Sequence, residues 1–382
     1  MLILPSSFEK VKKWLTSSGL AVNDTKDENY GGVHSFYDLK NNEYGFLYPE
    51  ITGYYISTLR FLYELEKDQK YLELAKHSAD WLISIYEKYG GIIQGLDGNK
   101  PRSKNVFSFD TAVCAKALID YYLLSDEKKY LDYGKRMVSW LVDDALDEDG
   151  TVKPIKNLDE NKFTVSNEVW YKQKGCLHIK TAMPLLSLYE LTKDNILLDK
   201  ATKICNTYNK FQRDDGSISL HQNNNAVNLH TQCYAIEGLL YAFYLTKNNH
   251  YLEICKRALM WASARIENDG SIQLWFGSKY KSKSSYATAQ LIRLMILVDK
   301  LDDNTSYKNQ TERLYSFLTS LQVHDKDTRI DGGFYEELYK SLFGWQKRAR
   351  INSWGSMFAL QAINWFENYE NLSFSDSIKL LF

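Results

Sequence analysis

The sequence predicts an all-α fold, an (α/α)6 toroid in which six helical hairpins close into a ring with short β-hairpins in the loops on one face. Two observations carry this prediction. A glycine-containing turn recurs about every sixty residues along the chain, and amphipathic helices alternate with nearly apolar ones. Because each hairpin buries its apolar face against its neighbours, residues 1–382 are expected to form a single toroid domain.

The recurring turn marks the same place in each repeat. Before each turn the apolar residues have helical spacing, as at 71–89, 130–146 and 251–266. These helices are rich in Lys and Glu, which is typical of an outer wall. After the turn, segments such as 217–220 and 271–274 have the pattern of short strands. The turns contain Gly31 and Gly32, Gly90 and Gly91, Gly150, Gly216, Gly270, and Gly332 and Gly333.

A second helix follows each turn and is apolar on nearly all sides, which indicates burial. The clearest examples are 111–124, 183–191, 233–245 and 357–366. Short polar links join each of these inner helices to the next outer helix, so the long loops lie on one face beside the inner-helix starts. Long loops on a rigid scaffold commonly carry function. An open helical solenoid is the alternative, but it need not bury one helix of every pair. The predicted inner helices start near Glu50, Asp110, His178, His230, Tyr286 and Asn352.

The composition limits the functional class. The chain has 47 basic and 48 acidic residues and a formal net charge of −1, with no long run of one sign, so a nucleic-acid partner is not indicated. No segment has the pattern of a secretory signal or of a membrane span, which favours the cytoplasm and no membrane partner. The five cysteines include no C-x-x-C pair and are expected to be buried, reduced thiols rather than metal ligands.

Two carboxylates begin consecutive inner helices and are the first candidates for catalysis. Glu50 follows Pro49 in a first turn, and Asp110 precedes an apolar run. Structural roles are open for both, since an acid complements the helix dipole and Asp is a common N-cap. Cleavage of a glycosidic bond, however, needs one protonated and one ionised carboxyl group facing each other. The equivalent positions of Glu50 and Asp110 in neighbouring repeats favour such a pair.

Histidines stand at the next two inner-helix starts, His178 and His230. A single histidine is more often a hydrogen-bonded structural group, but two at matching repeat positions favour a site. Either can exchange protons near neutral pH. Metal ligation needs three or four suitably spaced ligands, and we predict no metal site.

The sixth repeat supplies polar residues for substrate binding. Arg348 and Arg350 precede the last inner helix and can hold a carboxylate bidentately, although pairing with Glu336 and Glu337 is an equal alternative. Aromatic residues in the loops suit the apolar faces of sugar rings. The substrate-binding candidates are Arg348, Arg350, Asn352, Tyr48, Tyr54, Trp170, Trp275 and Trp354.

One motif points to different chemistry. Asp143, Asp144 and Asp147 match the D-D-x-x-D pattern with which isoprenoid-diphosphate enzymes bind Mg²⁺, and helical toroids include terpene cyclases. These acids end an outer helix and run directly into the Gly150 turn. A solvated acidic helix end is therefore the favoured interpretation.

The inner-helix starts resemble those of the six-hairpin glycosidase superfamily. Unsaturated glucuronyl hydrolases are similar in having an acid at two consecutive starts, where Glu50 and Asp110 stand here. In that family both are Asp and hydrate a vinyl-ether uronide, so the Glu at position 50 departs from the pattern. Segment 48–54 and the start at Asn352 also look like toroid proteins associated with bacterial surface-polysaccharide genes, and glucuronyl C5-epimerases have a comparable toroid.

The sequence therefore predicts a carbohydrate-active enzyme that cleaves a glycosidic bond in an acidic oligo- or polysaccharide. Glu50 and Asp110 are the predicted acid/base pair, His178 and His230 assist, and no cofactor is required. A uronate lyase or C5-epimerase is the alternative, because a Tyr or His base and an Arg suit removal of the proton beside a carboxylate. A non-catalytic glycan-binding toroid is the third possibility.

Overall fold

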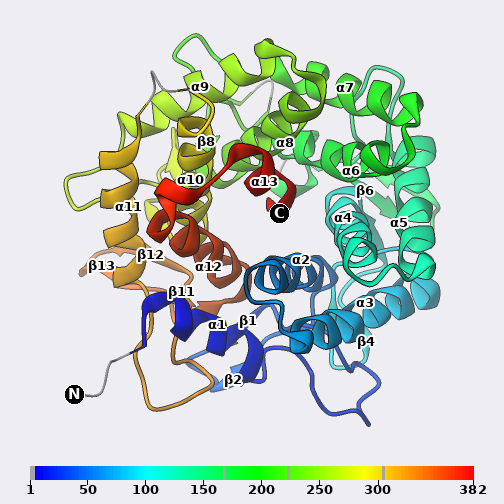
Figure 1. Ribbon diagram of the computed structural model, residues 1–382, viewed down its shortest axis with the longest axis horizontal. Coiled ribbons are helices and arrows are strands. Elements are labelled where there is room, and N and C mark those ends of the chain that lie inside the picture. The colour runs from blue at the N-terminus through cyan, green and yellow to red at the C-terminus, as the bar shows by residue number, and fades with distance from the viewer. Residues whose placement is uncertain (1–4, 167–168, 222–223, 303–305) are drawn as a thin grey trace.

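The computed structural model describes residues 5–166, 169–221, 224–302 and 306–382. These residues form six helical hairpins arranged in a ring (Figure 1), which confirms the predicted (α/α)6 toroid. The outer helices are α1 (Ser7–Ser17), α3 (Gln69–Tyr89), α5 (Lys128–Trp140), α7 (Asn195–Asn209), α9 (Asn249–Ser263) and α11 (Lys308–Ser320). The inner helices are α2 (Pro49–Glu66), α4 (Ser108–Ser125), α6 (Ala182–Thr192), α8 (Leu229–Thr246), α10 (Ser285–Asp299) and α12 (Ser353–Glu367).

The short links between inner and outer helices have one recurring construction. At the end of α6, Lys193 adopts a left-handed conformation (φ 58°), and Asp194 then caps α7 by accepting a hydrogen bond from the Ile196 amide at 2.9 Å. The links after α2 and α8 repeat this arrangement. An Asp or Asn at the cap satisfies amide groups that a helix start leaves unpaired. Three of the polar links predicted from the sequence thus supply a side-chain helix cap, whereas Glu127 before α5 makes no such bond.

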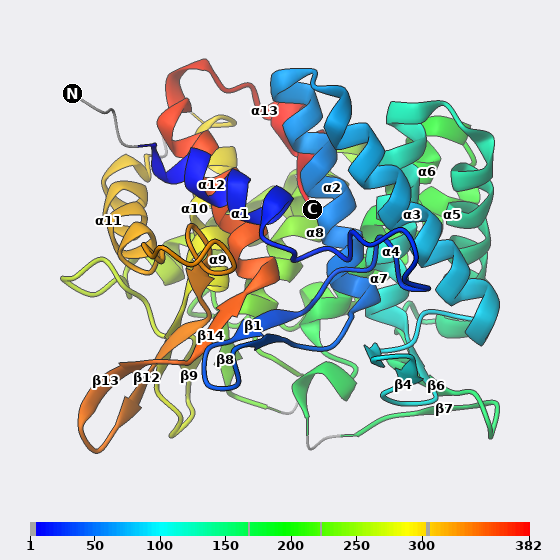
Figure 2. The same ribbon diagram turned by 90° about the horizontal axis from the view of Figure 1, so that it is seen from below.

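Strands occupy the long loops and lie together on one face of the ring (Figure 2). Most of the inner helices follow directly from a strand, and that strand pairs with the loop of the next repeat: β5 with β6, β8 with β9, and β10 with β12. This pairing ties neighbouring hairpins together on the loop face. The strands are β1 (Phe36–Asp38), β2 (Glu43–Tyr44), β3 (Leu96–Asp97), β4 (Lys100–Pro101), β5 (Asn105–Phe107), β6 (Ile155–Asn157), β7 (Lys162–Thr164), β8 (Val227–Asn228), β9 (Trp275–Phe276), β10 (Ser282–Ser284), β11 (Phe334–Tyr335), β12 (Glu337–Ser341), β13 (Gly344–Lys347) and β14 (Arg350–Asn352).

The strands predicted at 217–220 and 271–274 are wrong. Residue Ile218 makes only an isolated bridge with Gln212, and β9 begins at Trp275, after the second segment. In both places the hydroxyl and amide of the serine after the turn bind an aspartate, Asp215 or Asp269. Because the backbone amide of each serine donates to the aspartate, it cannot take part in strand pairing, and pairing begins later in the chain.

The ring closes where the first repeat meets the last. Strand β1 pairs with β14, with Phe36 opposite Asn352, and helix α1 packs against α12. The Trp14 indole donates a hydrogen bond to the Arg329 carbonyl at 2.8 Å. Gly332 lies against the Lys10 carbonyl of α1 with a φ of +95°. Equivalent turn glycines approach the next outer helix at Gly31, Gly150, Gly216 and Gly270.

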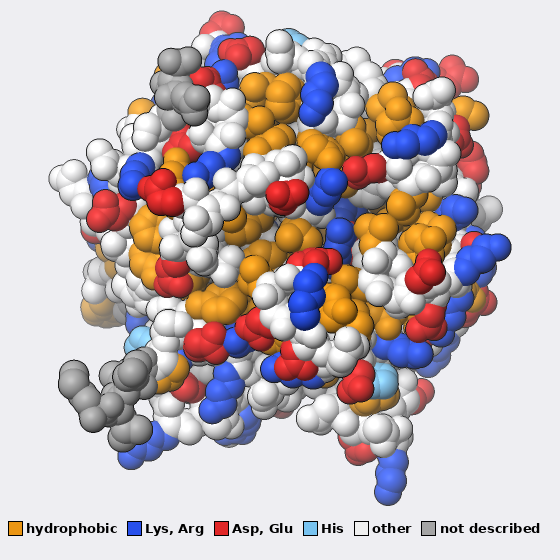
Figure 3. Space-filling view, in the orientation of Figure 1, with side chains coloured by type: hydrophobic (Ala, Val, Ile, Leu, Met, Phe, Trp, Pro, Cys, Tyr) orange, Lys and Arg blue, Asp and Glu red, His pale blue; other side chains and the backbone are white. Residues whose placement is uncertain are grey.

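The opposite face is covered by the C-terminal segment, which crosses the middle of the ring in Figure 1. This segment contains η4 (Tyr369–Asn371), α13 (Phe374–Ser377) and η5 (Ile378–Leu380). The Gln361 amide donates to the Leu380 carbonyl at 2.8 Å, and Arg293 donates to the Phe382 carbonyl at 3.3 Å. On this face, acidic and basic side chains are intermingled (Figure 3), in keeping with the balanced charge of the chain.

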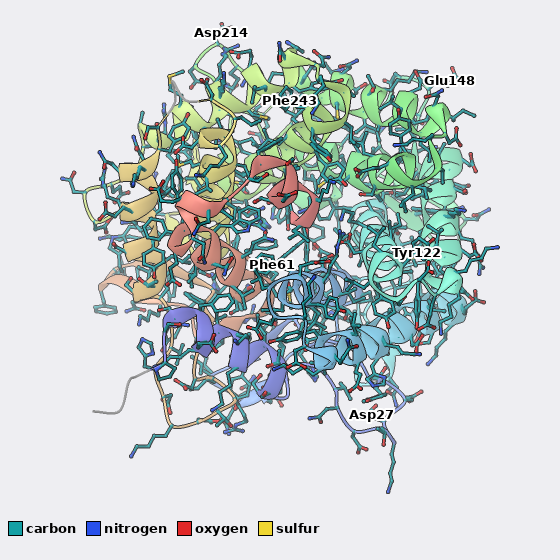
Figure 4. All side chains as sticks on the ribbon, in the orientation of Figure 1. Asp27, Phe61, Tyr122, Glu148, Asp214 and Phe243 are labelled. Atoms are coloured by element: carbon teal, nitrogen blue, oxygen red, sulfur yellow. The ribbon has the colours of Figure 1, made fainter. Side chains whose placement is uncertain are left out.

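Burial separates the inner helices from the outer wall. Phe61 of α2 lies inward, whereas the acidic residues Asp27, Glu148 and Asp214 lie at the periphery (Figure 4). All five cysteines are buried free thiols, as predicted. Among the helices that the structure describes, none has both the length and the apolar character needed to cross a membrane.

Gly332→Ala should destabilise the protein more than Gly344→Ala. Both glycines have positive φ, but a Cβ at Gly344 meets nothing within 4 Å, whereas one at Gly332 collides with the Lys10 carbonyl. We expect a loss of about 1 kcal/mol for Gly344→Ala, from backbone conformation alone, and about 3 kcal/mol or more for Gly332→Ala. Urea unfolding measures both, and equal losses would contradict the role given to the closing contact.

Candidate active site

A pocket of about 180 Å³ lies among the inner-helix starts and loop strands. Residues from all parts of the ring line it, including loops that are distant in sequence. Six of the predicted site residues meet there: Tyr48, Glu50, Asp110, Trp170, His230 and Trp354. The remaining lining residues are Ile51, Gln94, Phe107, Phe109, Tyr171, Leu177, Tyr234 and Tyr286.

Helix geometry brings the two carboxylates into this pocket. Glu50 is the second residue of α2, directly after Pro49, and Asp110 is the third residue of the neighbouring helix α4. The N-cap of α4 is Phe107, which makes no side-chain cap hydrogen bond, so Asp110 is not the helix cap. The two acids are nearly inaccessible, with 8% and 5% of their surface exposed. Such burial of carboxyl groups needs a reason other than helix capping.

Burial and proximity keep this pair from being fully ionised at neutral pH. Burial raises the pKa of Glu50 to about 7, against the opposing effects of a hydrogen bond from Tyr48 and the positive charge of Lys180. Burial also raises the pKa of Asp110 well above its usual range, and the negative charge of Glu50 raises it further. When the surroundings of two neighbouring carboxyls give them different pKa values, the group with the higher pKa can donate a proton and the other can accept one. The charge of an ionised Glu50 thus favours the protonated form of Asp110.

Aromatic rings form the walls of the pocket. Phe109 lies against Tyr234 with ring centroids 4.9 Å apart, and Tyr286 lies against Trp354 at 5.7 Å. Trp170 approaches the ring of His230 edge-on at 6.2 Å. A narrow cavity with aromatic walls and a few polar groups suits the apolar faces and hydroxyl groups of a sugar.

His230 is oriented by a chain of buried hydrogen bonds. The Gln290 amide donates through Nε2 to Glu237 Oε1 at 3.1 Å, so Gln290 Oε1 accepts from His230 Nδ1, at 2.5 Å. The proton of the imidazole is therefore on Nδ1, and Nε2 carries the lone pair. Burial, together with the charges of Lys180 and Arg293, lowers the pKa of His230 to about 3. His230 is a neutral hydrogen-bond acceptor in the pocket.

A buried ion cluster lies beneath the pocket. Glu237 accepts hydrogen bonds from Lys180 at 2.6 Å and from Arg293 at 2.8 Å, and all three side chains are at most 6% exposed. Lys180 Nζ also lies 4.6 Å from the ring centroid of Tyr234 and 4.9 Å from that of Tyr54. Two cations and one carboxylate leave one positive charge, which faces Glu50 and lowers its pKa. The cluster thereby favours ionisation of Glu50.

Two predicted site residues lie inside the protein rather than in the pocket. His178 is completely buried in η3 (Cys176–Thr181), with its Nε2 3.2 Å from the Gln173 carbonyl oxygen. Burial lowers its pKa to about 4. Tyr54 lies one turn below Glu50 and packs against Phe358, at 5.2 Å between centroids. A position near a helix start does not by itself determine on which side of the helix a residue lies.

The other four predicted binding residues also lie outside the pocket lining. Arg348 donates to Glu337 at 2.7 Å and to the Tyr280 hydroxyl at 2.8 Å, which is the structural alternative considered above. Asn352 is the buried N-cap of α12 and accepts from the Gly355 amide at 2.6 Å. Trp275 lies in strand β9, and Arg350 borders a separate cavity.

The D-D-x-x-D acids are placed on the outer wall. Asp143 and Asp144 lie in the π-helical turn η1 (Leu141–Ala145), and Asp147 forms ion pairs with Lys153 and Lys174. No group of three or more possible metal ligands occurs within the described ranges. The structure therefore gives no support to the diphosphate-binding interpretation.

Sequence reasoning did not identify the groups beneath the pocket. Glu237 and Arg293 are charged residues within otherwise apolar inner helices, and Lys180 lies in η3 just before another. That contrast is the signal that could have revealed them. The pocket residues Gln94, Phe109 and Tyr234 had no comparable signal, because uncharged residues of these types are common in ordinary cores.

The fold is that of known carbohydrate enzymes. Cellobiose 2-epimerase from Bacillus thermoamylovorans is similar, with a TM-score of 0.75 and 14% identity over 95% of this chain and 99% of that chain. A D-mannose isomerase is similar with a TM-score of 0.76 and 14% identity, over 97% of this chain and 100% of that chain. The unsaturated glucuronyl hydrolase of Bacillus sp. GL1 is similar with a TM-score of 0.69 and 14% identity, over 94% of this chain and 97% of that chain. No family model and no curated protein sequence matches the chain. At these identities the likeness establishes the toroid fold.

Glu50→Gln should remove part of the pH dependence of stability. The pKa of Glu50 is about 7 in the folded protein and 4.5 in a free side chain. The free energy of unfolding is therefore not reduced by Glu50 below pH 4.5, where the side chain is protonated in both the folded and the unfolded state. It then falls by roughly 3 kcal/mol as the pH rises through 7. Urea unfolding at a series of pH values should show a flatter dependence for Glu50→Gln. Glu148→Gln, at the exposed periphery, is the control (Figure 4), and a Glu50→Gln profile equal to that of the control would contradict the raised pKa.

Proposed function

We propose that the protein is a carbohydrate-active enzyme that hydrolyses a glycosidic bond, with Asp110 as general acid and Glu50 as general base. The observation that carries this proposal is the pair of buried carboxyls in an aromatic pocket, both with raised pKa values. Known enzymes of this fold include a glucuronyl hydrolase responsible for the degradation of glycosaminoglycan. That precedent supports a hydrolytic use of the toroid.

The proposed reaction divides the two proton transfers between the two acids. Asp110 donates its proton to the glycosidic oxygen as the bond from that oxygen to the anomeric carbon breaks. Glu50 accepts a proton from the water whose oxygen bonds to the anomeric carbon. Lys180 stabilises the carboxylate of Glu50 before the reaction, and His230 Nε2 can accept a hydrogen bond from a sugar hydroxyl. The products are two sugars with one water added between them.

The lining supports an uncharged sugar at the cleaved position. The acidic substrate predicted from the sequence depended on Arg348 and Arg350, and no lysine or arginine is among the described residues that line the pocket. An ionised Glu50 would also repel a uronate carboxylate in a site of low dielectric. Known toroid enzymes that act on cellobiose and mannose provide a precedent for neutral sugars in this fold.

Asp110→Asn and Glu50→Gln should each lower kcat by about 10²- to 10⁴-fold, the usual contribution of a general acid or base. Glu336→Gln is a matched control, since burial raises the pKa of Glu336 to about 7 but the residue does not line the pocket. The wild-type kcat/KM should rise as Glu50 ionises near pH 7 and fall at higher pH as Asp110 loses its proton. Asp110→Asn with wild-type turnover would exclude this mechanism.

A second candidate function follows from His230. A neutral imidazole with its lone pair on Nε2 can remove a proton from the carbon beside a sugar carbonyl only if its pKa, about 3 in this structure, rises when the substrate binds. A 2-epimerase and an isomerase share the fold. The uronate lyase or C5-epimerase predicted as an alternative is less well supported. Both would need a cation beside the substrate carboxylate, and the described lining contains none.

Isotopic labelling separates the two candidates. Hydrolysis in H₂¹⁸O should place one labelled oxygen at the new anomeric centre, with no deuterium bound to carbon when the reaction is run in D₂O. Epimerisation should place deuterium on carbon in D₂O and no ¹⁸O at the anomeric centre. His230→Asn should then abolish the incorporation of deuterium. Mass spectrometry of products from neutral and uronate-containing oligosaccharides measures both labels. Deuterium at carbon without ¹⁸O would overturn hydrolysis.

A further inference from the structure

A second, larger cavity of about 700 Å³ lies beside the pocket on the loop face. Strands β1 and β2, the β3–β4 hairpin and Arg350 of β14 surround it, and we call it the side cavity. It is rich in planar polar and aromatic side chains. Its charged lining residues are Asp27, Asp38, Glu43, Asp97, Arg102 and Arg350.

The side cavity and the pocket share a wall. Leu47 and Leu96 border the side cavity and are joined by backbone hydrogen bonds of 3.0 and 2.9 Å, while the nearby Tyr48 and Gln94 border the pocket. The ring of Phe46, on the side-cavity wall, is 5.2 Å from that of Tyr48. The ring centroid of Phe36 lies 6.3 Å from that of Phe46. The rings of Phe36, Phe46 and Tyr48 therefore lie in series across the shared wall.

The side cavity carries more negative than positive charge. Four carboxylates line it against two guanidinium groups, which gives a formal balance of −2. Asp97 holds Arg102 through contacts of 2.7 and 2.8 Å. Carboxylate, amide and guanidinium groups together bind hydroxyl groups as acceptors and donors. An excess of carboxylates opposes a polyanion.

Arg350 is available to a ligand. Its guanidinium lies 4.1 Å from the ring centroid of Phe36 and makes no side-chain hydrogen bond or ion pair with the residues that the structure describes. Arg102 lies in the same way 4.0 Å from the ring centroid of Phe46. Stacking of this kind restrains both guanidinium groups. The N–H donors of Arg350 stay unused among the described residues, whereas one nitrogen of Arg102 donates to Asp97. The charge of Arg350 acts on the buried Glu336, whose pKa it lowers.

We propose that the side cavity binds the sugar units next to the one held in the pocket, and that the substrate is an uncharged oligosaccharide longer than a disaccharide. This inference rests on the proposed function. The aromatic rings of the shared wall supply apolar contacts along the chain, and Arg350, Arg102 and the asparagines bind its hydroxyl groups. The charge of the side cavity sets the preference for chains without carboxylates.

The test compares gluco- and manno-oligosaccharides of increasing length, from the disaccharide upward, with uronate chains of equal length. The neutral chains should gain about tenfold or more in kcat/KM with length, the equivalent of one or two added hydrogen bonds. Arg350→Gln should remove most of that gain. Arg136→Gln is the matched control, because Arg136 also stacks on aromatic rings but lies exposed on the outer wall.

Calorimetric titration of the same sugars into Asp110→Asn separates this inference from the proposed chemistry. Tighter binding of longer neutral chains, weakened when Arg350→Gln is added, supports the side cavity even if no hydrolysis is found. Hydrolysis that is independent of chain length and of Arg350 overturns the inference and leaves the proposed function intact. A preference for uronate chains also overturns it.

Discussion

Closure of the ring is the constraint on which the rest of the structure depends. Inner helices such as α10, in which every residue is buried, are stable only when both neighbouring hairpins are present. The pairing of β1 with β14 and the contact of α1 with α12 supply the last of these neighbours. The same closure places Trp354 of the sixth repeat in one pocket with Glu50 and Asp110 of the first two. An open solenoid of the same hairpins would have neither the buried axis nor the pocket.

Burial at the axis also explains the chemistry of the site. The surroundings raise the pKa values of Glu50 and Asp110 because a low-dielectric interior disfavours their charged forms. The Lys180–Glu237–Arg293 cluster offsets this for Glu50 through its remaining positive charge. The two carboxyls thus differ because Glu50 interacts with the charge of Lys180, whereas Asp110 interacts with the charge of Glu50. Buried ion clusters rarely add stability, and here the cluster instead sets the charge state of the pocket.

The placement of the arginines changes the expected substrate. Arg348 is held by Glu337 in the loop sheet, and Arg350 faces the side cavity over Phe36. Neither reaches the carboxylate pair, so an acidic sugar at the cleaved position has no partner there. The proposed recognition of a neutral chain would instead use aromatic rings and planar polar groups, which line both the pocket and the side cavity.

The sequence by itself determined the ring of hairpins, the inner-helix starts and the pairing of Glu50 with Asp110 at equivalent positions. These features follow from periodic patterns, because apolar spacing and recurring glycines reflect the same burial in every repeat. Only the tertiary structure decided which residues at those starts face the pocket. His178 and His230 occupy matching places in sequence, yet a 3₁₀ turn at η3 directs one into the core and a regular α8 directs the other into the site. The direction of a side chain depends on local helix geometry and on neighbours from distant repeats, and neither is visible in a linear pattern.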